Sequence, residues 1–274
     1  MPSGSKHQGL PDPLLDKLRS LIARGSFGAV FDIDGTLSPI APTPQAAHVD
    51  HEMRVMLRQL THALPLVAVI SGRDAAKAQS MVGVEGLVYE GNYGLERCDG
   101  KCITDLALAS GYAPLIKHAL HEARLRLRLQ GLLFEDKRVT ASIHYRGCAD
   151  RAAARSAVLN CLQPVASKAG LRLTEGRFVV EIRPPIDVDK GTALADLVRG
   201  YHLRGVVFVG DDCSDVDAFH TVRNLRDSGR ADGAAIGVAS PEMPQEIPDC
   251  ADFVIDGVPG VRRLISWLTK EISQ

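Results

Sequence analysis

The sequence contains several short apolar runs rich in β-branched residues, and a small or polar cluster ends each of them. Such runs are typical of strands that are buried on both faces of a parallel sheet. Segments with helical periodicity, such as His51–Ala63 and Asp74–Val82, lie between the runs, and this alternation predicts a doubly wound α/β sheet. The three clearest runs are Phe27–Ile33, which precedes Asp34-Gly35, Leu66–Ile70, which precedes Ser71-Gly72-Arg73, and Val206–Val209, which precedes Gly210-Asp211-Asp212.

The polar clusters after these strands are the first candidates for a functional site. In doubly wound sheets, ligands bind in the crevice at the carboxyl ends of the strands. All three clusters fall at such ends, so side chains far apart in the sequence are expected to meet in one crevice.

Between Ala113 and Arg183 the order of elements changes to helix, strand, strand, helix, strand, strand. Pairs of strands joined by short turns predict antiparallel hairpins. We therefore expect a core domain of residues 1–112 and 185–274, an inserted α/β cap domain of residues 113–184, and Pro184-Pro185 at the return. The elements expected in the insertion are Leu115–Leu129, Leu132–Lys137, Val139–Tyr145, Arg151–Ala169, Leu171–Glu175 and Phe178–Ile182.

One segment of the insertion fits two structures. Residues 124–129 alternate arginine with leucine, and this period of two favours a strand, whereas the preceding residues favour a helix. We predict the helix, with its arginines on a solvated face rather than at a nucleic-acid site.

Composition argues against several classes of function. With 274 residues and a formal net charge of -1, the chain has no bulk attraction for nucleic acid or for an anionic membrane. No apolar run approaches the ~18 residues of a membrane span, and Met1–Leu10 lacks the apolar segment of a secretory leader. We expect a cytoplasmic protein and favour a monomer. The six cysteines form no CxxC pair, so we expect them to be free thiols.

Two carboxylates follow the first strand, in Phe31-Asp32-Ile33-Asp34-Gly35-Thr36-Leu37. An aspartate at a strand end can attack phosphorus and form an acyl phosphate, which suits Asp32. The carboxyl group of Asp34 can protonate the leaving oxygen and then deprotonate the attacking water. Gly35 permits a sharp turn, and Thr36 offers a hydroxyl group to phosphate.

A second acidic cluster, Gly210-Asp211-Asp212-Cys213-Ser214-Asp215, ends another strand. Hard carboxylate oxygens beside Asp32 are the ligands required by a Mg²⁺ ion shared with a phosphate. We expect Asp211 to ligate the metal directly and Asp215 to act through water. The sequence leaves open whether Asp212 or Asp215 supplies the second carboxylate.

Positive charge must offset these carboxylates before a phosphate dianion can bind. Lys190 supplies a charge, and Asp189 before it can cap a helix whose N-terminus favours anions. At the end of a third strand, Ser71 and Gly72 offer a hydroxyl group and backbone N–H groups. Lys190, Ser71 and Gly72 therefore join Thr36 as candidate phosphate ligands.

The order of these motifs resembles that of the haloacid dehalogenase superfamily, and the insertion resembles its C2-type caps. Within the superfamily the chain resembles the trehalose-6-phosphate phosphatases from Gly28 to about Ile265. The resemblance implies a Rossmann-like core with a cap. The motifs that carry it are Phe31-Asp-Ile-Asp-Gly-Thr-Leu-Ser-Pro-Ile40, Ser71-Gly-Arg73, Glu90-Gly-Asn-Tyr-Gly-Leu-Glu96, Glu135-Asp-Lys137 with His144-Tyr-Arg146, Glu181-Ile-Arg-Pro184, Asp189-Lys-Gly-Thr192 and Gly210-Asp-Asp-Cys-Ser-Asp-Val-Asp-Ala-Phe219.

The resemblance implies hydrolysis of trehalose 6-phosphate to trehalose and inorganic phosphate, with Mg²⁺ as cofactor and a small sugar phosphate as partner. It implies that Asp32 is the nucleophile and that Asp34 is the acid/base and a backbone-carbonyl ligand of the metal. Glu135, Lys137 and Glu181 of the cap are implied to bind sugar hydroxyls. The residues implied near phosphate or sugar are Arg73, Asn92 and Arg146, and the candidate metal set is Asp32, Asp34, Asp211 and Asp215.

The chain departs from the family pattern in the last acidic motif, near the expected sugar-binding side of the site. The family has GDD-x-T-D-E-D, whereas Ser214 and Val216 replace its Thr and Glu here. Val216 removes a carboxylate near the sugar-facing rim, so the sequence supports phosphatase chemistry more strongly than trehalose recognition. Ile33 replaces the usual Tyr, which matters less because a strand interior accepts either residue.

Other functions share parts of this pattern. A phosphatase of the same mechanism could act on sucrose phosphate or mannosyl-phosphoglycerate, and the core motifs cannot separate these substrates. A phosphomutase would need a sugar bisphosphate and usually carries a different cap, and a P-type ATPase or a dehalogenase would lack the carboxylate of Asp34. A non-catalytic sugar-phosphate sensor would not need that acid/base.

Overall fold

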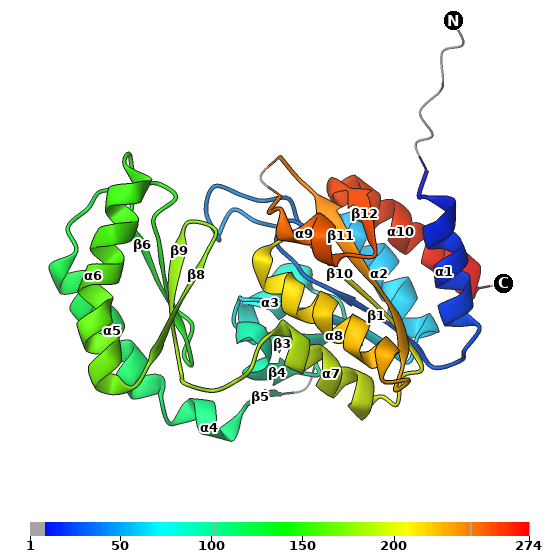
Figure 1. The fold of residues 1–274 in the computed structure, drawn as a ribbon, viewed down its shortest axis with the longest axis horizontal. Coiled ribbons are helices and arrows are strands. Elements are labelled where there is room, and N and C mark those ends of the chain that lie inside the picture. The colour runs from blue at the N-terminus through cyan, green and yellow to red at the C-terminus, as the bar shows by residue number, and fades with distance from the viewer. Residues whose placement is uncertain (1–8, 101, 242, 274) are drawn as a thin grey trace, which may run out of the picture.

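The computed structural model describes residues 9–100, 102–241 and 243–273, and their strands form two sheets (Figure 1). Among these residues the larger sheet has eight strands, in the order β12-β11-β10-β1-β2-β3-β4-β5. The strands from β12 to β3 are parallel, and β4 and β5 are antiparallel at one edge. The strands are β1 (Phe27–Phe31), β2 (Leu66–Ile70), β3 (Val88–Gly91), β4 (Glu96–Cys98), β5 (Ile103–Asp105), β10 (Gly205–Gly210), β11 (Asp232–Ala239) and β12 (Phe253–Asp256).

Helices cover both faces of the larger sheet. Along β1 the side chains of Ala29 and Phe31 join one apolar cluster and that of Val30 joins the other, as strand geometry requires. The predicted doubly wound α/β fold is therefore confirmed. The helices of the first cluster are α1 (Asp12–Ile22), α2 (His51–Ala63), α3 (Ala75–Val82) and α10 (Gly257–Ile272), and those of the second are α7 (Lys190–Gly200), α8 (Val216–Asp227) and α9 (Glu246–Cys250).

The smaller sheet has four antiparallel strands in the order β6-β7-β9-β8 among the described residues. Residues such as Ile143 and Val180 pack with two helices into an apolar cluster on one face. Polar residues in alternate positions, such as His144 and Glu181, line a cavity on the other face. The elements are α5 (Ala113–Arg126), β6 (Leu133–Asp136), β7 (Ala141–His144), α6 (Arg151–Ala169), β8 (Arg172–Gly176) and β9 (Val179–Arg183), preceded by α4 (Ala107–Ser110).

Some predicted boundaries are wrong. The first strand ends at Phe31 rather than at Ile33, because Ile33 O accepts the N–H groups of Leu37 and Ser38 in a tight turn. Helix α5 ends at Arg126 rather than at Leu129, because Leu127 adopts an extended backbone and packs against the apolar cluster of the smaller sheet. The helical part of residues 124–129 is thus confined to residues 124–126.

Two predictions from composition concern the whole chain. No helix in the described ranges is long and apolar enough to cross a membrane. All six cysteines are free, as expected. The first eight residues of the Met1–Leu10 segment lie outside the described residues.

Candidate active site

Asp32 and Asp34 follow the carboxyl end of β1, in the middle of the larger sheet. The N–H group of Asp32 donates to Val209 O at 2.8 Å, which continues the pairing with β10. Gly35 has a φ of 94°, and a side chain there would collide with the carboxylate of Asp211. The predicted turn at Gly35 therefore also brings the two acidic motifs together.

The ammonium group of Lys190 donates hydrogen bonds to two carboxylates near this turn. Lys190 Nζ donates to Asp32 Oδ1 at 2.6 Å and to Asp215 Oδ1 at 2.7 Å, and all three side chains are buried. Lys190 begins α7, where Asp189 and Thr192 form the capping box, so the predicted helix cap is confirmed. Burial opposes the charge on Lys190, but Asp215 and Asp32 outweigh it and raise the pKa of the ammonium group.

Asp32, Asp211 and Asp215 can offer carboxylate oxygens within 4.8 Å of one another. Asp215 Oδ2 accepts the N–H groups of Asp211 and Asp212, each at 2.9 Å, so both of its oxygens are already used. Both carboxylate oxygens of Asp211 are buried and accept no hydrogen bond. The guanidinium group of Arg177 lies 3.8 Å from Asp211 Oδ2.

The raised pKa values of the Asp32 and Asp211 carboxyl groups indicate that the cluster lacks positive charge. Burial raises the pKa of Asp32 to about 7, although Lys190 opposes the shift. Burial, followed by repulsion from neighbouring carboxylates, raises the pKa of Asp211 to about 9. A buried carboxylate without a hydrogen bond is costly, and a divalent cation would supply the missing partner. The donor set therefore fits a hard divalent cation.

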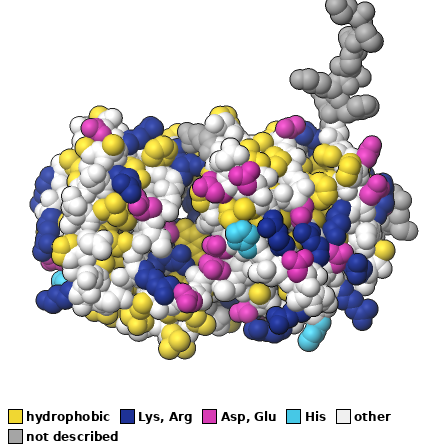
Figure 2. All heavy atoms as spheres, viewed as in Figure 1, with side chains coloured by type: hydrophobic (Ala, Val, Ile, Leu, Met, Phe, Trp, Pro, Cys, Tyr) yellow, Lys and Arg dark blue, Asp and Glu magenta, His cyan; other side chains and the backbone are white. Residues whose placement is uncertain are grey.

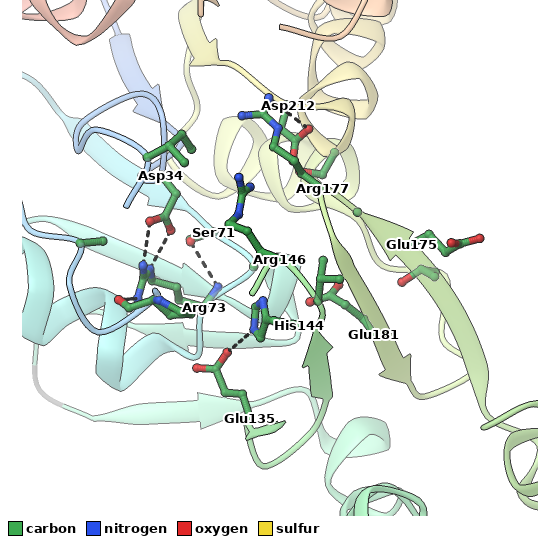
Figure 3. Close-up of a pocket in the computed structure, with 18 of the residues that line it drawn as sticks. Asp34, Ser71, Arg73, Glu135, His144, Arg146, Glu175, Arg177, Glu181 and Asp212 are labelled. Carbon is green, nitrogen blue, oxygen red and sulfur yellow. Dashed lines mark hydrogen bonds and ion pairs between the residues drawn. The ribbon is translucent and has the colours of Figure 1, made fainter. Parts of the chain in front are cut away.

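Arg73 fixes the position of Asp34, as Figure 3 shows. Its Nε and Nη2 atoms donate to the two carboxylate oxygens of Asp34, each at 2.7 Å. Its Nη1 atom donates to Pro44 O at 3.0 Å, which ties down the loop beside the cavity. The N–H group of Arg73 donates to Ser71 Oγ at 3.2 Å, so Ser71 and Arg73 lie at the same edge of the cavity as Asp34.

Lys137 and Glu181 of the smaller sheet form a buried ion pair. Lys137 Nζ lies 2.8 Å from Glu181 Oε1, and the same oxygen accepts the hydroxyl group of Ser142 at 3.0 Å. Lys137 Nζ also donates to Gly72 O at 2.9 Å, in the loop that follows β2 of the larger sheet. Lys137 and Glu181 both line the cavity.

Glu135 lies beside them with a partner for each carboxylate oxygen. Lys77 Nζ is 3.0 Å from Oε1, and His144 Nε2 is 3.2 Å from Oε2. Burial opposes the charge, but the hydrogen bond with His144 and the charges of Lys137 and Lys77 lower the pKa of Glu135 to about 2. Glu135 is therefore an ionised hydrogen-bond acceptor at the cavity wall.

Together these groups line a cavity of about 680 Å³ between the sheets. Figure 2 shows the surface hollowed there, with basic and acidic side chains at its margins. Most predicted site residues line the cavity: Asp32, Asp34, Ser71, Gly72, Arg73, Glu135, Lys137, Arg146, Glu181, Lys190 and Asp211.

Three predicted site residues are not among those that line the cavity. Asp215 is buried behind Lys190 and accepts its hydrogen bond. Thr36 is fully buried, and its hydroxyl group has no partner. Asn92 is also fully buried: its Nδ2 atom donates to Lys137 O at 3.0 Å, and its Oδ1 atom accepts the hydroxyl group of Thr140 at 2.5 Å. In this structure Asn92 holds the β6–β7 turn instead of facing the cavity.

The model of a family described as trehalose-phosphatase matches residues 30–247. The chain belongs to the trehalose-phosphatase family. A probable trehalose-phosphate phosphatase 3 of rice, Oryza sativa subsp. japonica, is 34% identical over 247 residues, which are 82% of this chain and 65% of the rice protein. A trehalose-phosphate phosphatase of Mycobacterium marinum is 36% identical over 236 residues, which are 79% of this chain and 59% of that protein.

This chain therefore spans less than two thirds of the length of these relatives. The C-terminal domain of Candida albicans trehalose-6-phosphate phosphatase has the same fold, with a TM-score of 0.77. The two chains are 20% identical, and the match covers 96% of this chain and 97% of that domain. At this identity the likeness concerns the fold alone.

The cavity also contains residues that the sequence motifs did not predict. Arg177 reaches it from the β8–β9 turn and lies 3.8 Å from both Asp211 Oδ2 and Asp212 Oδ1. Tyr93 has a φ of 63°, and the guanidinium group of Arg183 lies 4.6 Å from the centre of its ring. Tyr93 lies in the Glu90–Glu96 motif and Arg183 in the Glu181–Pro184 motif, so the sequence could have indicated both. No motif includes Arg177.

Val216, where the sequence departs from the family motif, lies in an apolar environment. Val216 begins α8 and packs against the apolar cluster of α7 and α8. The cavity lining in this segment comes instead from Cys213, Ser214 and Asp217. Next to the departure, Asp217 keeps a carboxylate on the cavity lining.

Proposed function

We propose that this chain hydrolyses trehalose 6-phosphate to trehalose and inorganic phosphate through a phosphoenzyme on Asp32. The observation that carries the proposal is the buried Asp32 carboxylate, held by Lys190 at the floor of a cavity whose opposite wall is polar. Family membership supports phosphate-ester hydrolysis, and the rice and mycobacterial relatives support the substrate.

The first half-reaction transfers the phosphoryl group to the protein. Lys190 occupies Oδ1 of Asp32, so we assign the attack on phosphorus to Oδ2. The bond between phosphorus and the sugar oxygen breaks, and Asp34 gives that oxygen a proton. Ser71, the backbone of Gly72 and Lys190 are assigned to the phosphate oxygens.

The second half-reaction releases phosphate. A water molecule attacks the phosphorus of the acyl phosphate, Asp34 takes its proton, and the Asp32 carboxylate leaves as phosphate departs. The two hydrogen bonds from Arg73 hold the carboxyl group of Asp34 in one orientation. Arg73 thereby orients the acid/base, which refines its predicted place near the phosphate.

We propose Mg²⁺ as the cofactor. Asp32, Asp211 and the carbonyl oxygen of Asp34 would hold it. Asp215 accepts hydrogen bonds from Lys190 and from the N–H groups of Asp211 and Asp212, so we assign it to positioning these residues and to acting on the metal through water. When bound, the ion supplies positive charge to the phosphate oxygens and to Asp211.

We propose residues 113–184 as the cap that reads the sugar, with residues 1–112 and 185–274 as the core. Glu135, Lys137, Arg146 and Glu181 lie on the cap side of the cavity, where sugar hydroxyls could replace or join their present partners. A monomer in the cytoplasm, with a small sugar phosphate as partner, completes the proposal.

A phosphate-release assay tests the substrate. The purified protein would be given trehalose 6-phosphate, sucrose phosphate, mannosyl-phosphoglycerate, glucose 6-phosphate and p-nitrophenyl phosphate, each with and without Mg²⁺. We expect the highest kcat/KM for trehalose 6-phosphate. A preference for another sugar phosphate would move the assignment to that substrate, and binding without phosphate release would indicate a sensor.

A further inference from the structure

Several contacts join the β6–β7 hairpin to the larger sheet and to the segments around it, and they differ in burial. Asn92 holds the turn of the hairpin, and Lys137 donates to Gly72 O, and both of these side chains are buried. Two ion pairs are more exposed: Arg138 of the turn lies 2.6 Å from Asp105 Oδ2 of β5, and Lys77 of α3 pairs with Glu135 of β6, with the Lys77 side chain 46% exposed. The contacts of Asn92, Lys137 and Arg138 hold the hairpin, so we assign the Lys77 pair to the side chain of Glu135.

The position of Lys77 is itself determined by its own helix. Asp74 caps α3 by accepting the N–H group of Lys77 through Oδ1 at 2.8 Å. The other oxygen of Asp74 lies 2.8 Å from Lys77 Nζ, which directs the ammonium group toward Glu135. The carboxylates of Asp74 and Glu135 are 11% and 10% exposed, so this cation bridges two largely buried anions.

We propose that Lys77 is a positioning residue that determines how well the site recognises the sugar, by orienting the carboxylate of Glu135. This inference rests on the proposed function. Lys77 holds Oε1 and His144 faces Oε2, so the carboxylate plane is set before substrate binds. Orienting an acceptor in advance lowers the entropic cost of binding a hydroxyl group, which improves affinity without altering the chemical step.

The substitution Lys77→Met should therefore affect binding of the sugar and not the chemical step. We expect the KM for trehalose 6-phosphate to rise about 3- to 10-fold, because one of two constraints on Glu135 is lost and the pair is partly screened by water. The kcat should stay within twofold. Hydrolysis of p-nitrophenyl phosphate, which has no hydroxyl groups to recognise, should not change. Lys77→Arg, which restores the charge, should recover the KM to within twofold.

A double-mutant cycle separates this role from a structural one. Because Lys77 acts through Glu135, adding Lys77→Met to Glu135→Gln should change the KM by less than twofold. The matched control is Lys117→Met, on an exposed position of α5, which should behave as the unmutated protein. Thermal unfolding of each variant reports whether the fold is kept.

The outcomes distinguish this inference from the proposed function. Turnover of trehalose 6-phosphate by the unmutated protein tests the function, and the ratio of KM values between variants tests Lys77. If the protein prefers another sugar phosphate, the same ratios are measured on that substrate. Additive effects in the cycle, an unchanged KM in Lys77→Met, or an equal loss on p-nitrophenyl phosphate would overturn the role of Lys77. No turnover of any sugar phosphate would overturn both.

Discussion

Lys190 Nζ lies 2.6 Å from Asp32 Oδ1, although 158 positions separate the two residues in the chain. The same ammonium group lies 2.7 Å from Asp215 Oδ1, and all three groups are almost completely shielded from water. One buried cation therefore compensates two buried anions, and the fold depends on it as much as the proposed chemistry does.

Replacing Lys190 with Met should destabilise the protein strongly. Removing one partner of a buried ion pair leaves an uncompensated charge, at a cost of about 3–5 kcal/mol. Urea unfolding at pH 7.5 in the presence of EDTA measures this difference. Lys190→Met combined with Asp215→Asn should recover part of the loss, because one of the stranded charges is removed. A loss below about 1 kcal/mol in the single variant would contradict this reading.

The buried carboxyl group of Glu90 should make the stability of the fold depend on pH. Burial raises the pKa of Glu90 from 4.5 to about 7, although Arg97 opposes the shift. Between these two values the folded protein keeps a proton that the unfolded chain releases, so stability should fall as pH rises from about 4.5 to about 7.

Glu90→Gln isolates this contribution, because the amide does not titrate. The variant should lose the part of the pH slope that belongs to Glu90, which corresponds to roughly 2–3 kcal/mol between the two limits. Urea unfolding at pH 5 and at pH 8 gives the slope. An identical slope in the two proteins would show that Glu90 is not protonated in the folded state near pH 6.

Much of this site could be predicted because its residues follow strand ends. The position of Asp32, Ser71 and Asp211 depends only on which runs form parallel strands, and a parallel sheet places all their carboxyl ends at one edge. The helix cap at Asp189 likewise follows from local hydrogen bonding. Local rules were sufficient for both.

What the sequence could not predict depends on how the two sheets meet. The motif around Asn92 indicated a functional residue, but its side chain holds the β6–β7 turn, a contact between segments 45 residues apart. Arg177 lies in a turn with no motif and reaches the acidic cluster only through docking of the smaller sheet. The orientation of a side chain across such an interface is set by packing, which periodicity and spacing do not encode.

Metal removal should stop activity. EDTA should abolish phosphate release and Mg²⁺ should restore it, whereas Ca²⁺, with a larger and looser shell of ligands, should support little turnover. Mg²⁺ should also raise the midpoint of thermal unfolding, because it binds the folded state. Asp211→Asn should weaken that rise, which separates metal binding from catalysis. Full activity in EDTA would show that the acidic cluster serves another purpose.

The last prediction separates the roles of the two aspartates that follow β1. Asp32→Asn should abolish turnover of every substrate while the protein stays folded, because an amide oxygen is a poor nucleophile of similar shape. Asp34→Asn should discriminate between substrates. The sugar oxygen of trehalose 6-phosphate needs a proton to leave, so its kcat/KM should fall about 10²- to 10⁴-fold. The leaving group of p-nitrophenyl phosphate departs without a proton, so its kcat/KM, which covers the steps up to phosphoenzyme formation, should fall much less.

Release of p-nitrophenol by Asp34→Asn should then show a burst. Attack by Asp32 still liberates one equivalent of p-nitrophenol, but the phosphoenzyme accumulates because no base deprotonates the water that should hydrolyse it. Stopped-flow absorbance measures the amplitude of the burst against the concentration of protein. Asp32→Asn is the matched control and should show neither burst nor turnover. Equal losses on both substrates with no burst would mean that Asp34 supports the fold or the metal rather than transferring protons.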